Sequence, residues 1–138
     1  GGNYCGKLND STDKLHEYVD CVIAAMETGV ITYIAHPDLF RFTGSNRIYA
    51  AEMQRICRSA VTTGTPLEIN FLGIRDGRHY PDERFWRIAG EERAPVTFGF
   101  DAHRPEDAFD AASLKTALDM VDRLGLNYIG EPRLRPLQ

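Results

Sequence analysis

Apolar residues follow two alternating patterns along the chain. Residues 12–28 carry them at three- and four-residue steps, which predicts an amphipathic helix with Ser11 or Thr12 as N-cap and Gly29 after its end. Residues 30–35 form a short, bounded, β-branched run that predicts a buried strand. The patterns then repeat: we expect helices over residues 47–63, from Pro81 onward and over 111–124, and strands over 66–71, 95–100 and 126–129.

Alternating helices and strands predict an α/β fold built from parallel βα units. No linker divides the chain, so we expect a single domain over residues 1–138, with a polar lead-in at 1–12 and an irregular tail at 131–138. The predicted strands are too few to close a barrel of the eight-stranded kind, which takes about 250 residues. The chain also begins with a helix. The pattern therefore indicates a domain entered halfway along.

Polar residues cluster where the predicted strands end. In parallel βα folds these ends converge on one face, where active sites are built. The residues concerned are His36 and Asp38 after the first strand, Glu68 and Asn70 within the second, and Asp101 and His103 after the third. We therefore expect one edge of the sheet to carry the chemistry.

The pair Asp101 and His103 has a chemical interpretation of its own. In an extended chain, residues two apart point to the same side, so a carboxylate and an imidazole could bind one metal ion or two neighbouring ones. Both groups suit Zn, Mn or Fe. The alternative is that Asp101 caps the following turn and His103 lies on the surface. A histidine at a strand end, such as His36, is also more often structural than a ligand.

Three segments together resemble the late motifs of the PHP-domain phosphoesterases, and most closely the histidinol-phosphatase type. They are residues 34–40 (Ile-Ala-His-Pro-Asp-Leu-Phe), 67–70 (Leu-Glu-Ile-Asn) and 99–107 (Gly-Phe-Asp-Ala-His-Arg-Pro-Glu-Asp). The resemblance covers nearly all of residues 13–130, with the motifs in the family's order and spacing. It implies the C-terminal half of a distorted (β/α)7 TIM-like barrel and the activity of a metal-dependent phosphomonoester hydrolase.

The resemblance also implies a metal centre. His36, Asp101 and His103 match metal ligands of the family, and Asp101 and His103 would be part of the catalytic machinery. The complete family site holds up to three divalent ions, for which Zn, Mn or Fe are the candidates. In such a site the metals activate water and neutralise the phosphate.

Other matched positions have supporting roles. Arg75 looks like the family arginine that meets the substrate phosphate, and Arg41 is a weaker candidate for the same role, since a planar guanidinium suits phosphate oxygens. Glu68 and Asn70 match the family pattern without being its ligands, and we expect them to orient their neighbours by hydrogen bonds. Asp38 is expected to steady His36 or its loop.

The sequence also departs from the family. The first family strand, with its His-x-His pair, and a later glutamate and histidine have no counterpart, and Phe100 stands where the family usually has Ser. We therefore expect this chain alone to bind metal weakly and to hydrolyse poorly. Three explanations stay open: a fragment of a longer enzyme, a half-gene product that pairs with the missing N-terminal half, or a degenerate, non-catalytic metal- or phosphate-binding module. Unpaired strand edges would favour self-association.

Charge and composition bear on the partners. The net charge of −4 argues against nucleic-acid binding, which usually needs a basic face. The resemblance implies a small phosphate ester as substrate, with a PHP phosphoesterase acting on nucleotides as an alternative. No apolar run is long enough to span a membrane and no signal-peptide pattern is present, which predicts a cytoplasmic protein. Cys21 and Cys57 lie in helical patterns and are expected to pack as small hydrophobic residues.

Overall fold

The computed structural model describes residues 10–70, 73–74, 77–99 and 111–130. This part of the chain is a mixed α/β fold, which confirms the predicted class at that level. Its helices are α1 (Thr12–Glu27), α2 (Asn46–Thr63), α4 (Glu83–Glu92) and α6 (Ala111–Leu124). Its strands are β1 (Leu67–Asn70), β2 (Pro95–Gly99) and β3 (Asn127–Tyr128), which lie side by side in that order and run parallel.

The helices begin and end where local chemistry favours it. The Ser11 hydroxyl caps α1 by accepting a hydrogen bond from the Lys14 backbone N–H at 3.2 Å. Gly64 ends α2 in the left-handed conformation with φ of 70°, which glycine adopts without steric cost. Helix α4 starts just after Pro81, because Asp82 provides the cap through a 3.0 Å bond from the Arg84 N–H.

Three expectations from the sequence are wrong. Residues 30–35 form no strand: their pairing with the sheet is a single bridge from Ile34 to Leu67, and Val30 is 76% exposed. A run of β-branched residues is typical of a strand but does not guarantee a partner on both sides. The last strand is shorter than expected, at Asn127–Tyr128. Cys21 lies on the exposed side of α1, whereas Cys57 is buried as expected.

The sheet has one apolar and one polar face. Because strand residues alternate between faces, the register of β1 and β2 gives the apolar face Leu67, Ile69, Val96 and Phe98, and the polar face Glu68, Asn70, Thr97 and Gly99. All eight are buried. The apolar set belongs to the same core as the buried side of α2, including Met53 and Ile56. The polar set is where chemistry can be placed.

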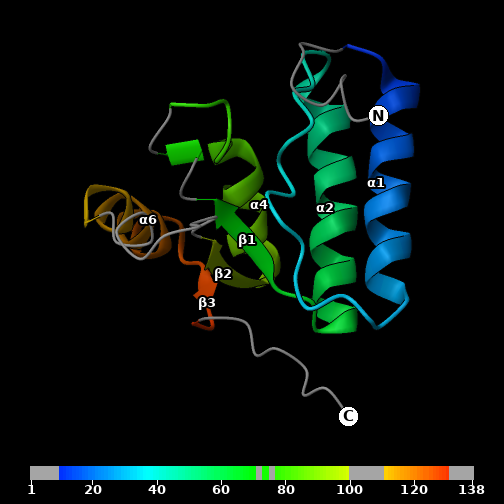
Figure 1. Ribbon diagram of the computed structural model, residues 1–138. Helices are drawn as coiled ribbons and strands as arrows, with labels where there is room; N and C mark the ends of the chain where they lie inside the picture. Colours follow the sequence, from blue (N-terminus) through cyan, green and yellow to red (C-terminus); the bar gives the residue numbers. More distant parts are fainter. Residues whose placement is uncertain (1–9, 71–72, 75–76, 100–110, 131–138) are drawn as a thin grey trace.

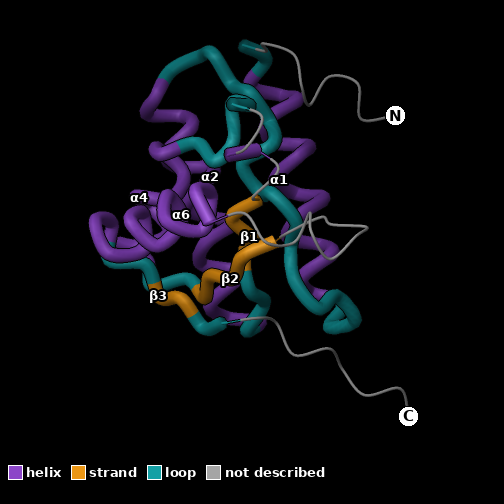
Figure 2. Tube along the Cα trace, turned by 60° about the vertical axis from the view of Figure 1, so that its left-hand side comes forward, coloured by secondary structure: helices purple, strands orange, loops and turns teal. Residues whose placement is uncertain are grey.

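The helices α1 and α2 lie side by side and run in the same direction, because residues 28–45 return from the end of one to the start of the other (Figure 1). Polar contacts join them: Glu52, on α2, accepts a 2.5 Å hydrogen bond from His16 on α1, and Arg55, also on α2, donates to Asp20 on α1 at 2.6 Å. Figure 2 shows α4 and α6 beside the short strands. The segment of residues 28–45, which contains His36, therefore passes beside β1.

Candidate functional site

His36 leaves the edge of the sheet in a fixed backbone position. Ile34 is held to the neighbouring strand by hydrogen bonds at 2.9 Å, from its N–H to Pro66 O and from the Glu68 N–H to its carbonyl. His36 then takes a positive φ of 28°, which is unusual for a residue with a side chain. The Glu68 Oε1 atom accepts the His36 N–H at 3.0 Å. The turn that places His36 is therefore held by a buried carboxylate from the next strand.

The Glu68 carboxylate is the centre of this arrangement. It is 1% exposed, and its Oε1 atom also accepts a 3.0 Å hydrogen bond from Asn70 Nδ2. Asn70 in turn accepts the Gly73 N–H at 3.0 Å. A Cβ atom on Gly99, in β2, would overlap the Glu68 carboxylate. Glycine at that position therefore leaves the space in which Glu68 lies across the end of β2.

Asp38 joins the same loop to helix α4. Its Oδ2 atom accepts hydrogen bonds from the Asp82 backbone N–H at 2.6 Å and from Trp86 Nε1 at 3.0 Å. Burial raises the pKa of Asp38 from its usual 3.8 to about 7; the hydrogen bonds that it accepts oppose this rise, and the nearby Asp82 charge adds to it. The residue fastens the loop after His36 to the start of α4.

Aromatic side chains surround the loop. The Tyr18 hydroxyl donates to the Pro37 carbonyl at 2.6 Å, and the rings of His36 and Tyr80 lie 5.2 Å apart between centroids. The Nδ1 atom of His36 is buried and has no hydrogen-bond partner within the described residues. A buried imidazole nitrogen without a hydrogen-bond partner is uncommon. One physical reason for such an atom is that it is kept available for a ligand. This atom fits the role of a metal ligand.

The other two predicted metal ligands, Asp101 and His103, lie outside the described residues, and so does Arg75, the predicted phosphate-binding residue. What the structure places is the end of β2, because Gly99 pairs with Asn70 at the edge where the Glu68 carboxylate holds the His36 turn. Among the residues that are described, no group of three or more His, Cys, Asp or Glu side chains could hold a metal ion. His36 is thus the one predicted ligand whose position the structure gives.

Arg41 lines a pocket. The pocket has a volume of about 620 Å³ and lies next to the His36 loop; its lining residues are Leu39, Arg41, Gly77, Arg78, His79 and Tyr80. Arg41 and Arg78 are exposed, and His79 is half-buried. No sequence pattern indicated Tyr80, which both contacts His36 and lines this pocket.

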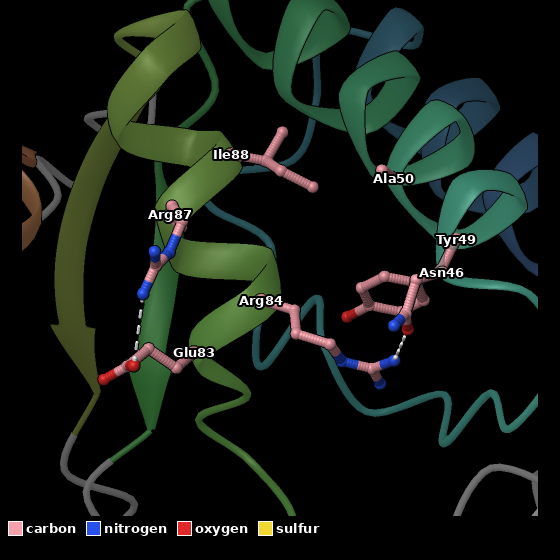
Figure 3. Close-up of a pocket in the computed structure, with 7 residues that line it drawn as sticks. All are labelled: Asn46, Tyr49, Ala50, Glu83, Arg84, Arg87 and Ile88. Carbon is pink, nitrogen blue, oxygen red and sulfur yellow. Dashed lines mark hydrogen bonds and ion pairs between the residues drawn. The ribbon is translucent and has the colours of Figure 1, made fainter.

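A second pocket, of about 300 Å³, lies between α2 and α4 (Figure 3). Arg84 crosses it, with its guanidinium carbon 4.1 Å from the Tyr49 ring centroid and its Nη1 atom donating to Asn46 at 3.0 Å. The other arginine of the pocket, Arg87, pairs with Glu83 at 3.5 Å. The residues that line this pocket therefore offer no set of metal ligands, and both of its cations are engaged with protein partners.

Comparison with protein-family models, curated proteins and solved structures returned no match. No helix in the described part of the chain combines the length and apolar character needed to cross a bilayer. The structural findings that bear on function are therefore the parallel sheet, the position of His36 at its edge, and the buried groups that hold it there.

Proposed function

We propose that this chain is a metal-dependent phosphomonoester hydrolase, similar to the histidinol-phosphatase type of PHP phosphoesterase, and that it supplies the C-terminal half of a distorted (β/α)7 barrel. The observation that carries the proposal is the buried His36 Nδ1 atom, which has no hydrogen-bond partner among the described residues. It lies in a loop that Glu68 and Asp38 hold in place. Parallel βα folds build their active sites at this edge.

The proposed ligands are His36, Asp101 and His103. Asp101 and His103 follow Gly99 by two and four residues in the sequence, and Gly99 ends β2 next to the end of β1. A bound Zn, Mn or Fe ion would supply Lewis acidity toward the phosphoryl oxygens. The set has one carboxylate and two imidazoles, which are ligand types that these metals accept.

The chain's own residues would do the positioning. Glu68 fixes the backbone from which the His36 imidazole projects, and Asp38 prevents the following loop from moving away from α4. The guanidinium of Arg75 would hold the phosphate oxygens in two parallel hydrogen bonds. Because these groups are already held in position before the substrate binds, less conformational entropy is lost on binding.

The metal proposal can be tested by binding and by hydrolysis. We expect the purified chain to bind Mn²⁺ or Zn²⁺ in equilibrium dialysis, and His36→Gln or Asp101→Asn to weaken that affinity by at least about tenfold, the loss typical of metal-site mutations. Hydrolysis of phenyl phosphate with added metal should fall in the same variants. His16→Gln is the matched control, because His16 lies on α1 and pairs with Glu52.

Two results would count against the proposal. If the chain binds no divalent metal, or if His36→Gln binds it as tightly as the unmodified chain and the His16→Gln control, His36 is a structural residue. If metal binds but phosphate esters are not hydrolysed even when the chain is supplied with an N-terminal half barrel, the non-catalytic module is the better account.

A further inference from the structure

The pocket beside the His36 loop has a distinctive charge. Within the described residues the guanidinium of Arg41 makes no hydrogen bond or ion pair, and no Asp or Glu is among the residues that line the pocket. Arg78 adds a second guanidinium, which donates to the Tyr80 hydroxyl at 2.6 Å and lies 5.8 Å from that ring's centroid. Among the described residues that line the pocket, Arg41 therefore offers a guanidinium without a partner and no side chain offers a carboxylate, which makes the pocket attractive to an anion.

The walls of this pocket are tied to His36. The Leu39 N–H donates to the His36 carbonyl at 3.0 Å, and the Leu39 carbonyl accepts a 2.6 Å hydrogen bond from His79 Nε2. Because a carbonyl only accepts, Nε2 is the protonated nitrogen of His79. Tyr80 belongs to both sites, since it lines the pocket and its ring contacts the His36 ring. The Tyr80 ring is therefore in contact with the proposed metal ligand and is part of the wall of the pocket that Arg41 lines.

We infer that this pocket receives a second oxyanion of the substrate, so that the enzyme prefers phosphate monoesters whose organic part carries a carboxylate or a further phosphate. The inference rests on the proposed function and narrows its substrate class. Arg41 then binds the organic end of the ester rather than the phosphate that is hydrolysed. A guanidinium suits both kinds of oxyanion, since each presents two oxygens in the geometry of its N–H groups.

Three esters test the preference: phenyl phosphate, para-carboxyphenyl phosphate and para-phenylene bisphosphate. We expect Arg41→Met to reduce kcat/KM for the esters with a second oxyanion about tenfold more than for phenyl phosphate, the factor typical of one lost charge-assisted hydrogen bond. Comparing the last two esters distinguishes a carboxylate from a phosphate. Arg47→Met is the control, because Arg47 is exposed on α2 and does not line the pocket. An equal loss on all three esters would overturn the inference.

A binding measurement separates this inference from the proposed function. Benzoate and phenylphosphonate, titrated without metal, should shift the backbone amide NMR signals of Leu39 and Gly77 in the unmodified chain and in Arg47→Met. Arg41→Met should bind them about tenfold more weakly. If these shifts occur but no ester is hydrolysed, the hydrolase proposal fails and the oxyanion site stands. If neither anion shifts these signals, the oxyanion site is refuted whatever the activity.

Discussion

Replacing Asp38 with asparagine should change how the stability of the protein depends on pH. Asp38 is 2% exposed, and burial raises its pKa from the usual 3.8 to about 7. The folded chain therefore keeps a proton on Asp38 between these values, whereas the unfolded chain loses it. Since the folded state binds more protons in this window, the free energy of unfolding must fall as pH rises from about 4 to about 7.

The size of the effect follows from the shift. Each pKa unit corresponds to about 1.4 kcal/mol, so Asp38 alone would reduce the free energy of unfolding by about 4 kcal/mol across the window. The asparagine side chain cannot ionise, but its amide oxygen can still accept hydrogen bonds from the Asp82 N–H and from Trp86 Nε1. The Asp38→Asn variant should therefore lack this part of the pH dependence. The difference between its free energy of unfolding and that of the unmodified chain should be more favourable to the variant above pH 7 than near pH 4.

Urea denaturation at a series of pH values measures the difference. Trp86 is the only tryptophan and is fully buried beside Asp38, so its fluorescence reports unfolding. Subtracting the two free energies of unfolding at each pH removes the contribution of the other titrating groups. Asp122→Asn, which replaces an exposed acid on α6, is the control. Parallel curves for Asp38→Asn and the unmodified chain would refute the reasoning.

Two other substitutions test the packing around the site. Gly99→Ala should lower the free energy of unfolding by about 1–3 kcal/mol and weaken metal binding, because a Cβ there overlaps the Glu68 carboxylate; an unchanged metal affinity would contradict the proposed part of Glu68 in holding His36. Met53→Ala should cost about 2–5 kcal/mol in the same denaturation assay, since Met53 is 1% exposed in the core. Metal binding by Met53→Ala at a temperature where it stays folded should match that of the unmodified chain.

The helices could be predicted because their signals are local. Ser11, one of the two expected N-caps, begins α1, and α2 ends at Thr63 as expected, because Gly64 caps it; both caps involve residues within one turn. The strand expected at residues 30–35 fails for the opposite reason. Strand pairing depends on a partner far away in the sequence, and the partner here meets this segment at one residue, Ile34.

The candidate site, like the fold, has a part that the sequence predicts and a part that it does not. The run His36-Pro37-Asp38 could be singled out from its position after an apolar stretch, but its hydrogen-bond partners could not. Asp38 binds groups 44 and 48 residues away, at Asp82 and Trp86. Nothing in the local composition around Trp86 indicates that its indole would donate to that carboxylate. The sequence therefore indicates which residues of the loop are candidates for a site, whereas the distant partners that hold the loop come only from the structure.

The link from Asp38 to the start of α4 has a consequence for the order of assembly. During synthesis the loop that carries His36 is made before Asp82 and Trp86, which lie more than 40 residues further along the chain. Until they have been made, the Asp38 carboxyl group lacks both of its hydrogen-bond donors, the Asp82 N–H and Trp86 Nε1. Contacts of such long sequence separation also form slowly. The loop can reach its final shape only after the first turn of α4 has been made, so the N-terminal part of this chain should not form the site by itself.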